Sequence, residues 1–219
     1  MFRISLIIPT YNRAAQLIAA LQSVVVQDLP PAEWECVVVN NRSDDDTAEQ
    51  FAAFAAAHPA CHLRMVDEQQ AGLSHARNRG IAEAQAPLLA FIDDDEWIEP
   101  QFLRAYVELF EVRPTAMAAG GPIVAEYPEG RPAWLSKYPE TAIANVMYFG
   151  RTIRPFPANR IPGGGNMALR REAFDLCGGF DPQLGRVGNK LTGGEENDLF
   201  ERLREQGYTF WYVPDAVMH

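Results

Sequence analysis

The chain has 219 residues, of which 47% are hydrophobic and 22% are charged, as in an ordinary soluble globular protein. Its net charge of −10 argues against a general nucleic-acid-binding protein, which would carry a basic surface. The three cysteines, Cys36, Cys61 and Cys177, are odd in number and widely spaced, which is typical of reduced thiols in a cytoplasmic protein. The amino-terminal apolar run is too short for a signal peptide, and no stretch is long enough to span a bilayer. We therefore expect a cytoplasmic enzyme.

Strands and helices alternate over the first part of the chain. Short apolar runs predict strands at 4–8, 35–39, 62–66 and 88–92. Helical spacing predicts a helix between each pair of strands and a fourth that begins at Pro100. Asp46 is the expected N-cap of the second helix, with Glu49 completing a capping box. This alternation predicts a mainly parallel sheet flanked by helices, with all four strand ends at one edge.

The second part of the chain is less regular. Residues 117–126 predict a strand with a bend at Gly120-Gly121, and 127–162 has no clear period and is interpreted as a variable excursion. The remaining expected elements are a strand at 166–169, a helical turn at 171–176, a helix at 195–206 and a strand at 208–213. We treat 1–219 as a single domain with two halves, 1–115 and 116–219.

An acidic cluster directly follows the fourth predicted strand. Asp93, Asp94, Asp95 and Glu96 stand where the apolar run ends, at the sheet edge where ligands bind in open α/β folds. Adjacent carboxylates repel one another, and a hard divalent cation with oxygen ligands would hold them together. Because strand side chains alternate, Asp93 and Asp95 can share one side while Asp94 points away. The alternative is a solvated acidic loop that caps the helix from Pro100.

The other strand ends also carry polar side chains. Tyr11 could stack on a planar base and Arg13 could neutralise phosphate, although both also suit a polar helix entry. Asn40 could hydrogen-bond the edge of a base or simply form a turn. Arg77 and Arg79 are two residues apart and cannot share a helical face, so we expect one to face the site and the other to face solvent.

Glycine patterns exclude some nucleotide-binding classes. Neither G-x-G-x-x-G nor G-x-x-x-x-G-K-[ST] occurs, which disfavours dinucleotide dehydrogenases and P-loop enzymes. The run 163–165 is three glycines, which offer close approach to a substrate or form a flexible turn. Because no glycine-rich phosphate-binding loop is present, a metal at Asp93 and Asp95 would have to hold the phosphates.

A second acidic centre opens the predicted helix at 195–206. Glu195 and Glu196 follow two glycines, and either could serve as a general base for an acceptor hydroxyl. Acidic residues also favour helix N-termini for the dipole alone. His219 could complete an oxygen-rich Mn²⁺ or Mg²⁺ site, although a lone histidine is more often structural.

In this order the motifs resemble those of the family-2 inverting glycosyltransferases, which have a GT-A type nucleotide-sugar-binding fold. The matching stretches are 5–13, 40–47, 72–80, 91–97, 164–168, 178–181 and 194–199. Each motif is weak by itself, and their ordered combination is specific. The resemblance covers most of the chain apart from 127–162.

The resemblance implies a role for each matching residue. The nucleotide would be held by Pro9, Thr10, Tyr11, Arg13, Asn40, Arg77, Asp93 and Asp94. The metal, Mn²⁺ or Mg²⁺, would be bound by Asp95, Asp93 and His219. Glu196, with Glu195 beside it, stands at the position of the catalytic base, and Gly164, Gly165 and Asn166 would lie on the acceptor side. The family usually has Asp at the position of Asn40, and its members commonly continue beyond the position of His219.

The resemblance further implies the reaction. We expect a metal-dependent inverting transfer of a sugar from a nucleoside-diphosphate donor, most often a UDP-sugar, to a hydroxyl of a carbohydrate or lipid-linked acceptor. Residues 1–115 would bind the donor, and 116–219 would supply the acceptor side and the base. A segment beyond His219 would account for any peripheral membrane association, at the inner face of the membrane. The alternatives are a sugar-1-phosphate nucleotidyltransferase and a non-catalytic nucleotide-sugar-binding domain.

Overall fold

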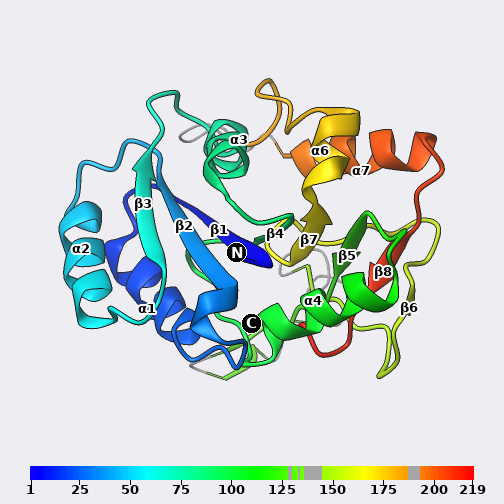
Figure 1. Cartoon of the computed structure of the whole chain (residues 1–219), viewed down its shortest axis with the longest axis horizontal. Helices are drawn as coiled ribbons and strands as arrows, with labels where there is room; N and C mark the ends of the chain where they lie inside the picture. The colour runs from blue at the N-terminus through cyan, green and yellow to red at the C-terminus, as the bar shows by residue number, and fades with distance from the viewer. Residues whose placement is uncertain (128–129, 133, 136–144, 187–192) are drawn as a thin grey trace.

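One sheet organises the whole molecule. The computed structural model describes residues 1–127, 130–132, 134–135, 145–186 and 193–219. Eight strands form a mixed sheet in the order β3-β2-β1-β4-β7-β5-β8-β6 (Figure 1). Its first four strands in this order come from the first half of the chain and its last four from the second half, so the two halves share a continuous sheet.

The first half forms the parallel part of the sheet, as predicted. Its strands are β1 (Ile4–Thr10), β2 (Trp34–Asn40), β3 (Leu63–Asp67) and β4 (Leu88–Phe91). β1 lies between β2 and β4 and is parallel to both, and β2 is parallel to β3. The carboxyl ends of these strands therefore lie at one edge, as the alternation of elements predicted.

The helices of the first half lie close to their predicted positions. They are α1 (Ala14–Val24), α2 (Thr47–Ala57), α3 (Leu73–Glu83) and α4 (Phe102–Val112), with a 3₁₀ turn η1 (Pro31–Glu33) before β2. The predicted capping box of α2 is wrong. Asp46 occupies the N-cap position without a side-chain cap bond, and its carboxylate accepts from Gln50 Nε2 instead. Asp45 accepts the backbone N–H of Thr47 at 3.1 Å, because a short carboxylate one residue earlier reaches the same helix start.

The second half reverses the strand direction. Its elements are β5 (Ala118–Gly120), β6 (Arg154–Pro155), β7 (Met167–Arg170), β8 (Phe210–Tyr212), α6 (Arg171–Cys177) and α7 (Glu195–Glu205). β7 is antiparallel to both β4 and β5. The predicted strand at 117–126 is regular only over Ala118–Gly120, and Ile123 further on makes isolated bridges with Met147 and Met218. A Cβ at Gly121 would lie 1.8 Å from the carbonyl oxygen of Ala216, so the predicted bend lies at a position of close packing. β6 lies inside the excursion 127–162 and was not predicted.

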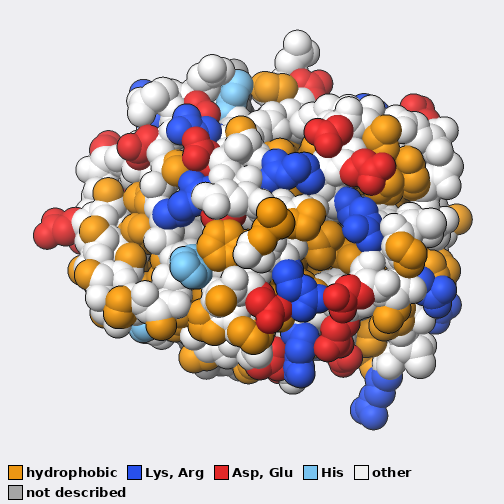
Figure 2. Space-filling model, in the orientation of Figure 1, with side chains coloured by type: hydrophobic (Ala, Val, Ile, Leu, Met, Phe, Trp, Pro, Cys, Tyr) orange, Lys and Arg blue, Asp and Glu red, His pale blue; other side chains and the backbone are white. Residues whose placement is uncertain are grey.

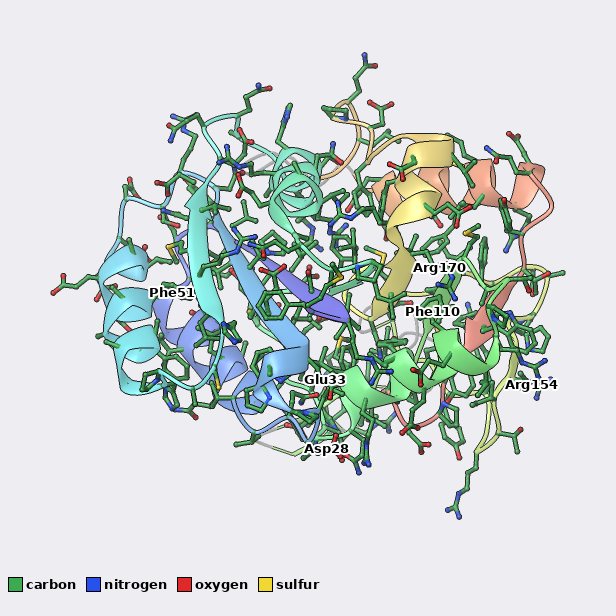
Figure 3. All side chains as sticks on the ribbon, in the orientation of Figure 1. Asp28, Glu33, Phe51, Phe110, Arg154 and Arg170 are labelled. Atoms are coloured by element: carbon green, nitrogen blue, oxygen red, sulfur yellow. The ribbon has the colours of Figure 1, made fainter. Side chains whose placement is uncertain are left out.

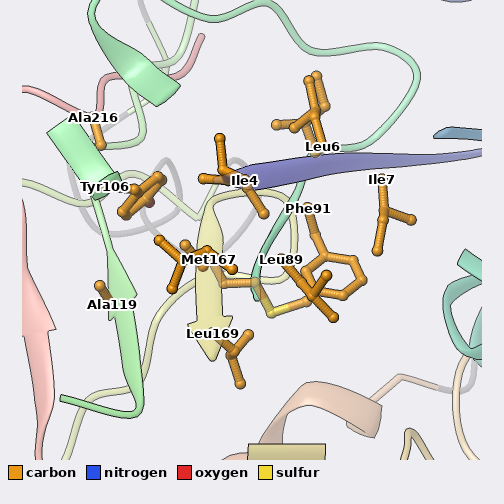
Figure 4. Close-up of a cluster of buried hydrophobic side chains, with 14 of the residues drawn as sticks. Ile4, Leu6, Ile7, Leu89, Phe91, Tyr106, Ala119, Met167, Leu169 and Ala216 are labelled. Atoms are coloured by element: carbon orange, nitrogen blue, oxygen red, sulfur yellow. The ribbon is translucent and has the colours of Figure 1, made fainter. Parts of the chain in front are cut away.

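The core lies on both faces of the central strands. Leu6 and Ile7 leave β1 on opposite sides, and both are fully buried (Figure 4). On the same sheet, Phe91 of β4 contacts Phe174 of α6 and Phe180 in edge-to-face pairs. Each fully buried side chain of this size contributes about 1.5–3 kcal/mol. A sheet covered on both faces explains why β1, β2 and β4 read as continuous apolar runs and not as alternating ones.

Helices cover the two sides of this sheet. In Figure 1, α3, α6 and α7 lie along the top of the view, and α1 and α4 lie along the bottom. The guanidinium of Arg170 lies over the ring of Phe110, 5.1 Å from its centroid, and joins β7 to α4 (Figure 3). Among the described residues, no helix has the length and apolar character needed to cross a membrane.

Candidate functional site

A cleft of about 920 Å³ opens at the carboxyl ends of β1 and β4 and reaches the starts of α3 and α7. Twelve of the fifteen predicted site residues line it: Pro9, Thr10, Tyr11, Arg13, Arg77, Asp93, Asp94, Asp95, Gly164, Gly165, Glu195 and Glu196. They come from parts of the chain that are more than a hundred residues apart in sequence. The fold therefore brings both predicted acidic centres into one cleft.

The acidic loop after β4 carries one buried carboxylate, Asp94, between two that are partly exposed, and all three line the cleft. Asp94 is buried and accepts hydrogen bonds from Thr10 Oγ1 at 2.7 Å and from Arg13 Nη1 at 3.2 Å. Asp93 and Asp95 have side chains that are 39% and 49% exposed. Burial raises the pKa of Asp94, opposed by the hydrogen bond from Thr10. The exposures alternate along the loop as predicted, but the two carboxylates that share a partner are Asp94 and Asp95, both at Arg13 Nη1, and not the predicted Asp93 and Asp95.

The exposed carboxylates of this loop suit a hard divalent cation. Asp95 Oδ2 contacts Arg13 at 2.5 Å and Asp93 Oδ1 contacts Arg77 at 3.3 Å, and in each case the second carboxylate oxygen has no hydrogen bond within the described structure. Oxygen donors of this kind are the ligands that Mg²⁺ and Mn²⁺ prefer. The described residues hold no cluster of three or more His, Cys, Asp or Glu side chains arranged for a metal. The remaining ligands would have to be substrate oxygens and water.

Glu96 shapes the floor of the cleft beneath this loop. Its Oε2 accepts the backbone N–H of Asp93 at 2.9 Å. Burial, and next the charge of Asp93, raises the pKa of Glu96 well above its usual range. A Cβ at Gly165 would lie 2.2 Å from Glu96 Oε2, so any side chain there would displace this carboxyl group.

Arg77 connects the acidic loop to the start of α7. Its side chain is 2% exposed and donates to Glu195 Oε1 at 2.8 Å, to Asp93 Oδ1 at 3.3 Å and to the carbonyl oxygen of Gly164 at 3.2 Å. Arg79 is 40% exposed at its side chain and pairs with Glu83 one helical turn away. The prediction that one of the two arginines faces the site and the other faces solvent is confirmed.

Glu196 is the half-buried carboxylate beside this buried pair. Burial, and next the neighbouring charge of Glu195, raises the pKa of Glu196 above its ordinary value. α7 begins at Gly194, whose φ of +107° lies in the left-handed region that favours glycine. A Cβ at Gly164 would lie 3.5 Å from Glu196 Oε1, so the absence of a side chain there leaves room next to the carboxylate.

Three predicted residues do not line the cleft. Asn40 donates to Asp67 Oδ1 and accepts from the backbone N–H of Ser43, both at 3.0 Å, so its amide is used within the turn after β2. Asn166 is fully buried, with its amide donating to the carbonyl oxygens of Pro122 and Ala216. Asn40 is the last residue of β2, which extends one residue further than predicted, and Asn166 precedes β7, which begins one residue later than predicted.

His219, the third of these residues, was predicted to bind the metal with Asp93 and Asp95 but does not line the cleft. Its ring stacks on Trp97 with the centroids 3.7 Å apart. Glu99 and Glu126 stand 3.3 Å from its two ring nitrogens. Reciprocal backbone hydrogen bonds between Trp97 and His219 fix this arrangement. Its neighbours are therefore one aromatic ring and two glutamates, and its role as a metal ligand stays a prediction.

The cleft contains residues that were not predicted. These are Asn41, Arg42, Asp44, Ala71, Gly72, Leu73, Ala76, Glu96, Ile123, Asn145, Arg186 and Gly193. Asn41 donates to the carbonyl oxygens of Glu68 and Gln70 and accepts from the N–H of Gly72, so it holds two strand-end loops together. Because Asn41 directly follows the predicted site residue Asn40, its place in the cleft could have been predicted from the sequence. Ile123, Asn145 and Arg186 reach the cleft only through tertiary packing, and no local pattern marks them.

Comparisons with known proteins agree with this fold. The sequence pattern of Glycosyl transferase family 2 matches residues 5–177. The glucosyl-dolichyl phosphate glucuronosyltransferase of Haloferax volcanii is 27% identical over 212 residues, which cover 93% of this chain and 64% of that protein. The succinoglycan biosynthesis protein ExoM of Rhizobium meliloti is 26% identical over 212 residues, covering 96% and 64%. The chain thus spans less than two thirds of the length of these relatives.

Solved structures share the architecture. The mannosyltransferase PcManGT of Pyrobaculum calidifontis, in complex with GDP-Man and Mn²⁺, superposes with a TM-score of 0.72 at 24% identity, covering 99% of this chain and 56% of that one. TarS 1–349 of S. aureus, in complex with UDP-GlcNAc, gives a TM-score of 0.71 at 17% identity, covering 99% and 57%. At these identities the likeness concerns the fold, which is GT-A. The pattern over residues 5–177 covers well over half of the sequence, and the chain belongs to glycosyl transferase family 2.

Proposed function

We propose that this chain transfers a sugar from a nucleoside-diphosphate donor to an acceptor hydroxyl, with inversion at the anomeric carbon and with the help of a divalent metal ion. The observation that carries the proposal is the link through Arg77, which joins Asp93 of the acidic loop to Glu195 beside Glu196 in one cleft. A carboxylate pair for a metal and a second carboxylate for a proton are the groups that this reaction requires.

The charges of the cleft support a metal-bound donor. Its lining residues include seven carboxylates and four guanidinium groups, so a diphosphate alone would meet net repulsion. Two of the four arginines, Arg13 and Arg77, already pair with carboxylates. Arg42 and Arg186 are exposed and could neutralise phosphate oxygens. Asp93 and Asp95 would hold the ion, which when bound stabilises negative charge on the leaving diphosphate.

The nucleotide would enter beside β1. Tyr11 follows this strand, lines the cleft and is 52% exposed, so its ring is available for stacking on a base. PcManGT was solved with GDP-Man and TarS with UDP-GlcNAc, so related folds accept either base. We propose a UDP-sugar as the first donor to test and a GDP-sugar as the second.

Glu196 would act as the general base. Its carboxylate takes the proton of the acceptor hydroxyl while the hydroxyl oxygen forms the new bond to the anomeric carbon. The bond from that carbon to the diphosphate oxygen breaks with its electron pair, which leaves on the diphosphate. Glu195 is neutralised by Arg77 and would act as a positioning residue. The space beside Gly164 would admit the acceptor next to Glu196.

The acceptor belongs to the part of the cleft furthest from β1. The Haloferax volcanii relative is described as acting on a glucosyl-dolichyl phosphate, which favours a lipid-linked sugar at the cytoplasmic face of a membrane as the class to test first. Tyr148 and Trp134 are exposed in the second half and could also stack on sugar rings. Tyr138, expected to do the same, lies outside the described residues.

Calorimetric titration of UDP in the presence of Mn²⁺, repeated with EDTA, tests the donor site. We expect binding with the metal and a loss of binding without it. GDP, CDP and dTDP are titrated in the same way to identify the base. Absence of a binding signal for all four nucleotides, both with Mn²⁺ and with EDTA, would reject the donor site. Metal-dependent binding without transfer from any member of a nucleotide-sugar panel to lipid-linked or soluble acceptors would favour a non-catalytic binding domain.

A further inference from the structure

A segment without acidic residues lies beyond the cleft. Between residues 141 and 171 there is no Asp or Glu, although 29 of the 219 residues in the chain are acidic. Five arginines fall in this segment. Arg170 and Arg171 donate to backbone carbonyl oxygens of the fold, whereas Arg151, Arg154 and Arg160 are exposed. In a protein of net charge −10, this segment is a local basic surface.

The loop at 148–155 is anchored firmly at its base. The ring of Phe149 packs on Phe156 and on Tyr212, with centroid distances of 5.4 and 5.3 Å. Arg154 Nη1 donates to the carbonyl oxygen of Phe149 at 3.5 Å. Gly150 has φ +100° and turns the chain where L side chains are disfavoured. The loop therefore presents a defined outer side to solvent.

That outer side combines apolar and basic groups. Tyr148 is 63% exposed and Ile153 is 45% exposed, and Arg151 and Arg154 alternate with them along the loop. Figure 3 labels Arg154 at the lower right edge of the molecule, and Figure 2 shows Lys or Arg groups projecting from that edge beside hydrophobic surface. Tyrosine, aliphatic and arginine side chains together are the composition found at membrane–water interfaces.

The adjacent edge strand disfavours a protein partner that adds a strand. β6 has two residues, Arg154 and Pro155, and both are exposed. Proline has no N–H to donate to a further strand, and a charged side chain blocks close pairing. A bilayer surface requires no such pairing, only headgroup contacts and shallow insertion of apolar side chains.

We infer that the 148–155 loop docks the protein on a bilayer surface that carries anionic lipid headgroups. At physiological salt, charges more than about 8 Å apart are largely screened, so the charges nearest the loop have the largest effect on its interaction with a surface. One acidic side chain, Asp215, lies near Tyr212 at the base of the loop and opposes it. Asn145, three residues before Tyr148 in the sequence, lines the cleft.

Co-sedimentation with vesicles tests the inference without any need for enzymatic activity. The full chain is mixed with vesicles of phosphatidylcholine alone or with about one third phosphatidylserine, at low and at high salt. We expect binding to the anionic vesicles at low salt, weaker binding at high salt, and little binding to the neutral vesicles. Failure of the wild-type chain to bind the anionic vesicles at low salt would overturn the inference, whatever the outcome of the nucleotide titration.

Two double variants with the same change in net charge locate the binding surface. Arg151→Glu/Arg154→Glu should lower the vesicle partition coefficient by about 30-fold or more, since each arginine near an anionic surface contributes about a factor of five. Ile153→Ser should lower it less and remain salt-sensitive. The control Arg79→Glu/Arg104→Glu changes two exposed arginines on α3 and α4 and should retain binding within about threefold. Equal losses in both double variants would show general charge attraction and reject the loop as the docking surface.

Discussion

The two acidic centres of the cleft are built from carboxylates in different environments. Asp93 and Asp95 follow β4 in a half-exposed loop and contact Arg77 and Arg13 through one oxygen each. Glu195 at the start of α7 is buried and fixed by Arg77, and Glu196 beside it is half-buried with a raised pKa. Exposure leaves the first pair open to a cation, whereas burial and the neighbouring charge of Glu195 raise the pKa of Glu196 and suit it to proton transfer.

The comparison teaches that position on the fold decides the chemistry of a carboxylate. A strand end leaves side chains at the sheet edge with free oxygens, which suits metal and phosphate. At the start of α7, Glu195 is buried against Arg77 of α3. Its charge lies beside Glu196, whose pKa it raises. The two centres should therefore respond differently when their charges are removed.

The largest expected effect is on turnover when the proposed base is removed. Glu196→Gln should lower kcat by about 10²–10⁴-fold, the usual contribution of a positioned base, while the affinity for the metal–nucleotide complex stays unchanged. Initial rates and calorimetry on the same preparation measure the two quantities. Glu205→Gln, an exposed residue at the far end of α7, serves as the control. Unchanged turnover in Glu196→Gln would remove this residue from the mechanism.

Next in size is a loss of stability when the link between the centres is cut. Arg77→Met leaves Glu195 buried without its partner and should lower the free energy of unfolding by about 3–5 kcal/mol. For a chain of this length, each kcal/mol lowers Tm by about 2–4 °C, measured by thermal unfolding. Arg79→Met removes an exposed pair two residues away and should cost less than about 1 kcal/mol.

A second variant separates the buried charge from the packing of Arg77. Arg77→Met/Glu195→Met removes both charges, so no unpaired carboxylate remains, and most of the lost stability should return. If Arg77→Met has the same free energy of unfolding as Arg79→Met, the contacts of Arg77 with Glu195 and Asp93 do not stabilise the fold.

The sequence predicted the first half of this arrangement well. The strands at 4–8, 35–39 and 88–92 are buried on both faces, and such strands appear as continuous apolar runs with polar residues at their ends. The strand at 62–66 lies at the edge of the sheet and is only partly buried. The acidic loop was visible because Asp93 follows such a run directly. Local pattern and tertiary position agree in this half, so the sheet edge and its lining could be inferred.

The rest of the site depends on packing that no local pattern encodes. Asn40 and Asn41 are adjacent and chemically identical, and only the length of β2 decides that Asn41 lines the cleft while Asn40 bonds Asp67. Asn166 stands beside two cleft glycines, yet close approach of Gly121 to Ala216 brings carbonyl oxygens to its amide. His219 was assigned to the metal by resemblance, and stacking on Trp97 gives it other neighbours.

A smaller effect, on nucleotide affinity, is expected when a carboxylate of the half-exposed loop after β4 is removed. Asp95→Asn removes one of the two carboxylates proposed to hold the ion and should weaken Mn²⁺-dependent nucleotide binding by about 10–100-fold. Stability should change little, because Asp95 is half-exposed and Arg13 retains Asp94. Calorimetry with UDP and Mn²⁺ measures the affinity, with Asp46→Asn before α2 as a control of equal charge. Affinities that match between Asp95→Asn and the wild-type chain would contradict the metal site.

The smallest expected effect is a shift in the pH dependence of kcat/KM. A general base works only when ionised, so activity should fall as the pH drops through the pKa of Glu196, which burial and the charge of Glu195 hold above its ordinary value of 4.5. Glu195→Gln removes that charge while its amide oxygen can still accept from Arg77. The pKa of Glu196 should therefore fall, and the acidic limb of the profile should move to lower pH. Glu205→Gln should leave the limb in place. If the acidic limb stays fixed in Glu195→Gln, the charge of Glu195 does not affect the pKa of Glu196 in the active protein. The two glutamates would then be neighbours in the cleft without any effect of one on proton transfer by the other.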